Sequence, residues 1–243
     1  MADDTTTADN TRPADRSGMD RAFLTRDPEA GELILVRHGE QDVPADGTED
    51  FARYIDPPLS ARGQRQALAV GLALAGVTVS AVYSSRLQRA HQTALAIAGH
   101  HRLGVTVVDA LREIEMFRDL PAGKGPAEVY GIEAIREARD AFIATRRWTC
   151  YPGTESGAEL AARIVPAIEA VVAAHPAHRV VVACHGGVIN CYLAEVLGIS
   201  GEDMFFRPAH ASVHRVAFAG DRRVVLTLNE AFHLPSVDDL LSW

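Results

Sequence analysis

Two histidines occupy equivalent places after two short apolar runs of the chain. His38 and His185 each lie two positions beyond such a run (33–36 and 180–183), and a glycine directly follows each of them. Continuous apolar runs of this length are typical of parallel strands that are buried on both faces. Ligands of open α/β sheets bind beyond the carboxyl ends of the strands, so we expect both imidazoles at one ligand-binding edge. An imidazole nitrogen there is able to take a phosphoryl group covalently.

Arginines adjoin the same predicted edge. Arg37 directly precedes His38, and Arg86 and Arg89 lie just after a predicted strand at 77–83, in the first turns of a helix. Guanidinium groups match phosphate oxygens in bidentate fashion and offset the charge of a transferring phosphoryl group. Their positive charge also disfavours protonation of His38, which keeps a nitrogen lone pair available for attack. Arg86 is more typical of a rim charge than of a phosphate ligand.

A carboxylate and a helix start complete the predicted site. Glu113 follows a predicted strand at 105–108, where it is able to protonate a leaving oxygen and later activate water. Gly186 precedes a predicted helix at 187–197, whose free N–H groups suit an anion. These residue types suit phosphoryl transfer without a metal. The sequence has neither a C-x-x-C nor an H-E-x-x-H spacing, so we assign no metal site and expect no cofactor.

Five motifs in order resemble those of the histidine phosphatase (phosphoglycerate mutase-like) superfamily. They are Arg37-His38-Gly39-Glu40, the segments 56–60 and 63–67, the segments 84–90 and 92–94, Leu111-Arg112-Glu113-Ile114, and Ala183-Cys184-His185-Gly186-Gly187. Any one of them is a weak signal, but five in this order form a strong one. The resemblance covers roughly residues 33–228 and implies the fold of that family.

The resemblance also implies roles for single residues. His38 would be the phosphorylated nucleophile, and Glu113 would donate the proton to the leaving group. Arg37, Arg89 and His185 would bind the phosphoryl oxygens, with Gly186 beside them, and His185 would also take part in catalysis. Glu115 competes with Glu113 for the role of the acid, because the segment after Glu113 departs from the family pattern.

The expected activity is metal-independent hydrolysis of a small phosphomonoester through a phosphohistidine intermediate. One alternative is a phosphoglycerate-type phosphomutase, and another is a catalytically weak module that binds a phosphorylated ligand. Mutases of this family carry a distinctive aromatic and glycine-rich stretch just after the acid glutamate. Residues 114–121 do not resemble it, which favours the hydrolase.

Alternating strand and helix patterns from Leu33 onward predict the elements that position these residues. They favour an α/β fold, a three-layer αβα sandwich around a mostly parallel sheet. We expect helices at 60–75, 87–100 and 127–146, a helix that begins at a capping box on Ser156 and is kinked at Pro166, and a final hairpin of 212–218 with 223–228.

Composition sets the organisation of the chain and its surroundings. Residues 1–26 are rich in Asp, Thr and Arg and are predicted to be a disordered tail. Residues 27–243 are predicted to form a single domain with a lid-like insertion at about 114–155. A net charge of −8 argues against a nucleic-acid partner, and no run is apolar and long enough for a membrane span. Three cysteines without a disulfide pattern suit a reducing compartment, so we expect a cytoplasmic protein of undetermined oligomeric state.

Overall fold

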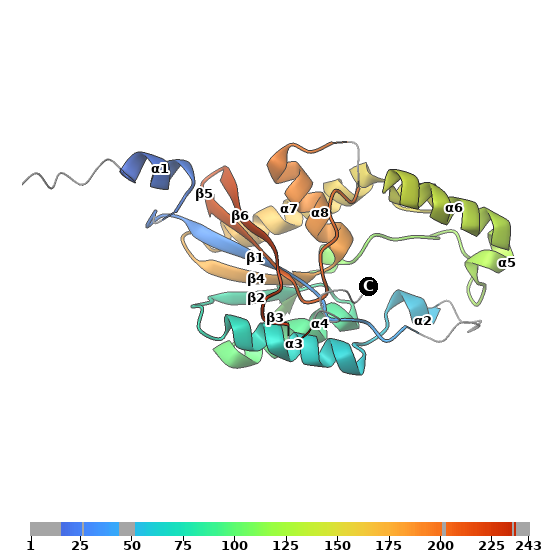
Figure 1. The fold of residues 1–243 in the computed structure, drawn as a ribbon, viewed down its shortest axis with the longest axis horizontal. Helices are drawn as coiled ribbons and strands as arrows, with labels where there is room; N and C mark the ends of the chain where they lie inside the picture. Colours follow the sequence, from blue (N-terminus) through green and yellow to red (C-terminus); the bar gives the residue numbers. More distant parts are fainter. Residues whose placement is uncertain (1–15, 26, 44–51, 201–202, 235, 237–243) are drawn as a thin grey trace, which may run out of the picture.

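A mixed sheet forms the centre of the molecule (Figure 1). The computed structural model describes residues 16–25, 27–43, 52–200, 203–234 and 236. Within them, six strands pair in the order β3-β2-β4-β1-β5-β6. They are β1 (Gly31–Arg37), β2 (Ala81–Ser84), β3 (Val105–Val107), β4 (Arg179–Cys184), β5 (Val213–Ala219) and β6 (Arg222–Glu230). The first four strands in this order are parallel, whereas β5 runs antiparallel to β1 and β6 antiparallel to β5.

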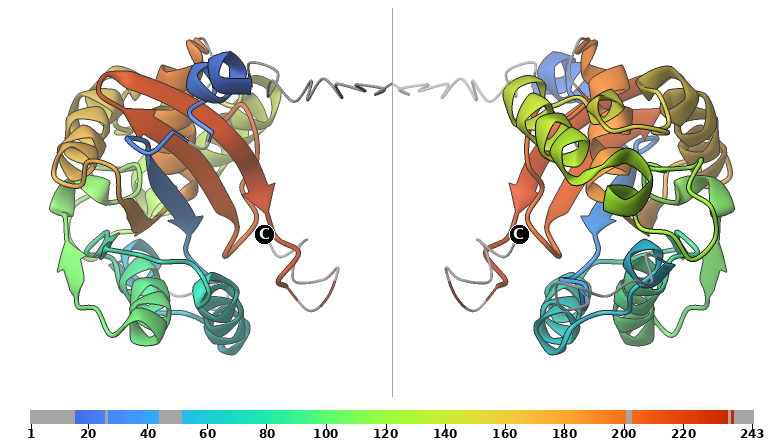
Figure 2. Two further views of the ribbon diagram at one scale, coloured as in Figure 1. Left: turned by 90° about the vertical axis from the view of Figure 1, so that its left-hand side faces the viewer. Right: turned by 90° about the vertical axis from the view of Figure 1, so that its right-hand side faces the viewer.

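Helices cover both faces of this sheet (Figure 2). In chain order the helices are α1 (Arg16–Ala22), α2 (Ala52–Ile55), α3 (Ala61–Leu74), α4 (Gln88–His101), α5 (Pro126–Tyr130), α6 (Ile132–Thr145), α7 (Gly157–Ala173) and α8 (Gly186–Leu197), with 3₁₀ turns η1 (Asp109–Leu111) and η2 (Trp148–Cys150). The pair α3 and α4 packs on one face, and the pair α7 and α8 packs on the other. The predicted three-layer α/β architecture is confirmed.

The central strand β1 shows why the two layers form. Its side chains alternate between the two faces with a period of two residues. Leu33 and Leu35 pack in the core beneath α7 and α8, whereas Ile34 and Val36 pack in the core beneath α3 and α4. None of these four side chains is accessible to solvent. An unbroken apolar run is therefore required here, because both faces of the strand are covered.

Local signals for helix ends correspond to contacts in the structure. Ser60 caps α3, since its Oγ accepts a hydrogen bond from the backbone N–H of Gly63 at 3.0 Å. Ser156 and Glu159 form the predicted capping box at the start of α7. Pro166 lies inside α7, which continues through it as one helix from Gly157 to Ala173. Buried side chains before and after the proline hold both halves against the sheet.

Two predicted boundaries are wrong. The helix predicted at 127–146 is divided into α5 and α6 at Gly131, whose φ of 87° lies outside the helical range. The strand predicted at 77–83 begins only at Ala81, so β2 is shorter than the segment that the sequence pattern predicted to be a strand.

The predicted disordered tail is also wrong in part. Residues 16–22 form α1, and Leu24 just after it is buried. Arg222 at the start of β6 donates hydrogen bonds to the carbonyls of Arg21 and Ala22, which ties this segment to the edge of the sheet. Residues 1–15 and 26 of the predicted tail lie outside the described residues. In the part of the chain that the structure describes, no helix is long and apolar enough to cross a membrane.

A buried ion pair connects α7 to the segment that carries Glu113. The Arg163 guanidinium donates to both carboxylate oxygens of Glu155, at 2.6 and 2.7 Å. It also donates to the backbone carbonyls of Ala110, Arg112 and Glu113. The side chains of Arg163 and Glu155 are only 13% and 4% exposed, so every one of these contacts is shielded from water.

Removal of one partner of this pair should destabilise the protein. Glu155→Gln leaves the guanidinium buried without its counter-charge, and such a loss typically costs about 3–5 kcal/mol. We expect a lower urea midpoint for Glu155→Gln in a chemical unfolding experiment. The matched control is Glu133→Gln, which removes an exposed pair with Arg136 and should cost less than about 1 kcal/mol. Equal effects of the two variants would contradict this interpretation of the pair.

Candidate active site

The two predicted histidines lie side by side at the carboxyl edge of the sheet. Strands β1 and β4 are paired in register, with Arg37 opposite Cys184, so the next residue of each strand end is a histidine. The backbone N–H of His38 donates to the carbonyl of Cys184 at 3.0 Å. The ring centroids of His38 and His185 are 5.0 Å apart. The predicted juxtaposition of the two imidazoles is therefore present in the structure.

The hydrogen bonds of His38 determine which nitrogen is free. Its Nδ1 lies 2.7 Å from the carbonyl oxygen of Gly39, and a carbonyl only accepts, so Nδ1 carries the proton. The lone pair is then on Nε2, which accepts a hydrogen bond from Nε of Arg89 at 3.3 Å. Burial, followed by the charges of Arg89, His185 and Arg37, holds the pKa of His38 well below its ordinary value. The ring is thus neutral with an available nitrogen.

Buried polar nitrogens beside His38 lack partners. Among the described residues, Nε of Arg37 and both ring nitrogens of His185 are buried and make no hydrogen bond. Burial without a partner is unfavourable for such polar groups, and an unsatisfied group of this kind requires an explanation. Arg37 is held in place by a hydrogen bond from its Nη1 to the carbonyl of Pro208 at 2.6 Å. An anion that accepts hydrogen bonds between these groups would satisfy them.

Burial also changes the pKa values of these groups. The pKa of Arg37 is lowered to about 10, mainly by burial and against the attraction of Glu113. The pKa of His185 is held well below its ordinary value by burial and by the charges of Arg89 and Arg37. Arg37 therefore stays cationic at neutral pH, whereas the lowered pKa of His185 favours its neutral form.

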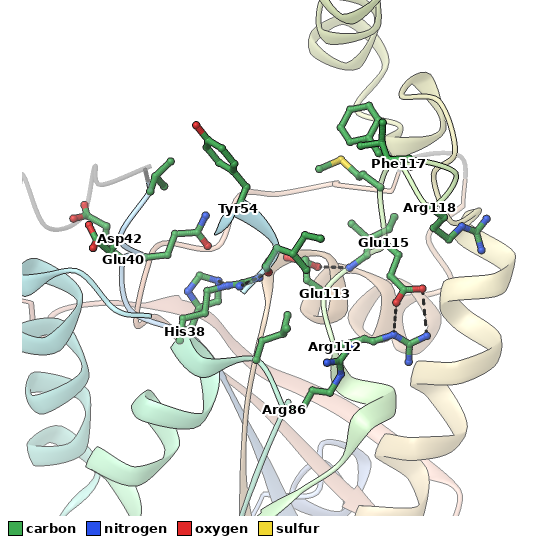
Figure 3. Close-up of a pocket in the computed structure, with 18 of the residues that line it drawn as sticks. His38, Glu40, Asp42, Tyr54, Arg86, Arg112, Glu113, Glu115, Phe117 and Arg118 are labelled. Carbon is green, nitrogen blue, oxygen red and sulfur yellow. Dashed lines mark hydrogen bonds and ion pairs between the residues drawn. The ribbon is translucent and has the colours of Figure 1, made fainter. Parts of the chain in front are cut away.

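The structure separates the two candidate acids. Glu113 faces the cavity near His38, where its Oε1 accepts hydrogen bonds from the backbone N–H groups of Gly187 and Ile114 at 3.1 and 3.0 Å (Figure 3). Glu115 points instead to Arg112, with which it forms an ion pair at 2.8 Å. The hydrogen bond with Arg112 lowers the pKa of Glu115. Glu113 is thus close enough to Arg37 and Arg89 to affect their pKa values, whereas Glu115 is engaged by Arg112, so Glu113 is the better placed of the two candidates.

The glycines after His185 allow close approach at the start of α8. A side-chain carbon added at Gly187 would lie 2.5 Å from Oε1 of Glu113, so any larger residue would push the carboxylate away. A carbon added at Gly186 would lie 3.8 Å from Nε of Arg37. Gly186 therefore borders the unsatisfied guanidinium nitrogen, as its predicted place beside the phosphoryl oxygens requires.

Two further residues adjoin the site without having been predicted. His210 is buried, and its ring centroid lies 5.7 Å from that of His38. Arg207 is close enough to Arg37 to lower its pKa. Both precede β5, and no motif marks them in the sequence. They reach the site because β5 pairs with β1.

A cavity of about 1040 Å³ opens above these groups (Figure 3). Arg37, His38, Arg89, Glu113 and His210 contribute to its lining, together with side chains of α2 and of the segment 112–124. His185 and Gly186 lie beneath this surface and are buried. In the described part of the chain, no group of three or more histidine, cysteine, aspartate or glutamate side chains is arranged to hold a metal ion.

Comparisons with known proteins agree with this geometry. Residues 33–231 match the histidine phosphatase superfamily (branch 1). The chain is 32% identical over 212 residues to the metal-independent phosphoserine phosphatase of Arabidopsis thaliana, covering 86% of this chain and 85% of that protein. It is 26% identical over 221 residues to the probable phosphoglycerate mutase GpmB of Salmonella choleraesuis, covering 86% and 98%.

Solved structures show the same likeness. A mycobacterial glucosyl-3-phosphoglycerate phosphatase superposes with a TM-score of 0.66 at 25% identity, over 83% of this chain and 100% of that one. YhfR of Bacillus stearothermophilus superposes with a TM-score of 0.68 at 24% identity, over 84% and 98%. In fold, in the order of its motifs and in the match over nearly its whole described length, the chain belongs to the histidine phosphatase superfamily.

Proposed function

We propose that this enzyme hydrolyses small phosphomonoesters through a phosphohistidine on His38 and needs no metal ion. The arrangement around His38 carries the proposal. Its Nε2 carries the lone pair and meets the guanidinium of Arg89, the pKa of His38 is depressed, and buried nitrogens of Arg37 and His185 without partners lie beside it. A neutral nucleophile beside unsatisfied cationic donors is what transfer of an anionic group requires.

The first chemical step forms the phosphoenzyme. Arg37, Arg89 and His185 hold the phosphoryl oxygens, and the lone pair on Nε2 of His38 attacks phosphorus in line with the leaving oxygen. The nitrogen–phosphorus bond forms as the phosphorus–oxygen bond breaks, and protonated Glu113 gives its proton to the departing alcohol. The hydrogen bond from Nδ1 of His38 to the carbonyl of Gly39 keeps the ring oriented.

The second step returns the enzyme to its starting state. Ionised Glu113 takes a proton from water, the water oxygen bonds to phosphorus, and the bond to Nε2 of His38 breaks. Inorganic phosphate leaves, and Glu113 is again protonated for the next cycle. The same carboxylate thus serves as acid and then as base, which suits its place beside Gly187 in the lining of the cavity.

Hydrolysis is favoured over a mutase reaction. A mutase must keep water from its phosphoenzyme while an intermediate reorients. Residues 114–121 lack the family's mutase-like stretch, and the more similar of the two relatives above is named as a phosphatase. A lid role for the insertion at 114–155, a cytoplasmic location and the absence of nucleic-acid or membrane partners stay predictions.

Loss of the nucleophile should abolish turnover. His38→Ala removes the only atom proposed to bond to phosphorus, so kcat for p-nitrophenyl phosphate should fall on the order of 10⁴-fold or more. Labelled substrate should give an acid-labile, base-stable phosphoenzyme with the wild type and none with the variant. His100→Ala, at an exposed position of α4, is the matched control and should label normally. A label on serine or aspartate would contradict the mechanism.

The two glutamates should respond differently to the same substitution. Glu113→Gln should lower kcat for alkyl phosphates by about 10²- to 10⁴-fold, because their leaving oxygens need a proton. The loss should be smaller with p-nitrophenyl phosphate, whose leaving group departs as a stable anion. Glu115→Gln should keep turnover close to the wild type with both esters. The reverse pattern would assign the acid role to Glu115.

Turnover should survive chelation. The charges of Arg37 and Arg89 take the place that a metal would have in offsetting phosphoryl charge, so incubation with EDTA should leave kcat unchanged. Loss of activity with EDTA that a divalent ion restores would contradict this assignment.

Rapid conversion of 3-phosphoglycerate to 2-phosphoglycerate with trace 2,3-bisphosphoglycerate, far faster than release of phosphate, would show a mutase instead of a hydrolase.

A further inference from the structure

One wall of the cavity is apolar and adjoins the phosphoryl site directly. The side chains that form this apolar wall come from α2 and from the segment after Glu113; they are Tyr54, Ile55, Met116, Phe117 and Leu120. Tyr54 and Phe117 flank the space above Glu113 (Figure 3). The carbonyl of Ile55 accepts a hydrogen bond from Nη1 of Arg89 at 3.2 Å, which fixes this wall to a phosphoryl-binding arginine.

Cations that line the rest of the cavity already have counter-charges within the protein. Arg112 uses Nε and Nη2 for Glu115 and Nη1 for Asp109. Arg118 uses all three guanidinium nitrogens for the Glu159 carboxylate and the carbonyls of Gly153 and Thr154, and its side chain points away from the cavity in Figure 3.

The remaining two cations of the lining are also in ion pairs. Lys124 pairs with Glu128 one turn further along the chain. Arg86 pairs with Asp109 through Nε at 2.6 Å. Asp109 also pairs with Arg112, so Arg86 shares its counter-charge with a second cation. Arg86 is therefore the cation on which an anionic leaving group would depend.

We propose that this part of the cavity binds an uncharged, apolar or aromatic leaving group, and that it selects against a leaving group with a second anionic charge. The inference rests on the proposed function, since it concerns the alcohol that departs from phosphorus. An apolar group would cover the apolar wall and remove it from water. A second anion would have to compete with an internal carboxylate at Arg112, Arg118 or Lys124, and it would lose hydration beside an apolar surface.

A series of alkyl esters separates leaving-group binding from chemistry. The probes are n-propyl phosphate, n-hexyl phosphate and 6-phosphonooxyhexanoate, whose leaving oxygens have similar basicity. Full burial of a methylene contributes about 0.8 kcal/mol, or about fourfold, so kcat/KM should rise about tenfold or more from propyl to hexyl. The terminal carboxylate of the third ester should abolish that gain.

Variants locate the effect on the apolar wall. Ile55→Ser should lower the ratio of kcat/KM for the hexyl ester to kcat/KM for the propyl ester. Because Ile55 is 55% exposed, the variant should stay folded. Leu95→Ser is the matched control, at a 51% exposed leucine of α4 outside the cavity, and should leave the ratio unchanged. Arg86→Gln should also keep the preference for the hexyl ester.

The outcomes distinguish this inference from the proposed function. If all three esters are hydrolysed through a phosphohistidine but the carboxylate ester is the best substrate, the inference is overturned and the hydrolase stands. Loss of that carboxylate preference in Arg86→Gln would then assign the subsite to an anionic leaving group. Absence of turnover with every ester and of any labelled histidine would overturn both.

Discussion

The parallel pairing of β1 with β4 is the contact on which the site depends. It aligns Arg37 with Cys184, so the chain leaves both strands at the same level and places His38 beside His185. The alternating burial of β1 between two helical layers holds that register, because a shift by one residue would turn Leu33 and Leu35 toward the wrong layer. The position of the proposed nucleophile is therefore set by the packing of the whole core.

Burial at this edge has two consequences that support each other. It keeps His38 neutral, with its lone pair on Nε2, and the charges of the Arg89 and Arg37 guanidinium groups act in the same direction. It also leaves nitrogens of Arg37 and His185 without partners among the described residues. Unsatisfied buried groups raise the free energy of the folded protein. A bound phosphoryl group would lower it by accepting hydrogen bonds from them.

The segment around Glu113 contacts α7 and α8 and also contributes to the lining of the cavity. The ion pair of Arg163 and Glu155 holds its backbone from the side of α7, and the N–H of Gly187 orients the Glu113 carboxylate from the side of α8. Beyond the glutamate, Phe117 contributes to the apolar wall where the leaving group departs. The proposed acid and the proposed leaving-group surface therefore lie on one short segment of the chain.

The sequence by itself determined the parts that depend on neighbours in the chain. The apolar runs before His38 and His185, the caps at Ser60 and Ser156 and the order of the motifs were sufficient for the three-layer fold and for the proximity of the two histidines. The break between α5 and α6 at Gly131 was not predicted. A glycine in a helical pattern can continue the helix, and here the helix breaks because the backbone of Gly131 adopts a positive φ.

Only the tertiary structure decided the rest. It placed Glu113 beside Gly187 and near Arg37 and Arg89, and Glu115 against Arg112, although both glutamates fit the same short stretch. It brought His210 to the site through the antiparallel pairing of β5 with β1. It also joined Ile55 to Arg89 and supplied a carboxylate for each cation of the cavity lining beyond Arg37 and Arg89. Some of these contacts join residues that are far apart in the chain, and others involve only one of two neighbouring residues. They depend on strand order and side-chain packing, which local sequence patterns do not encode.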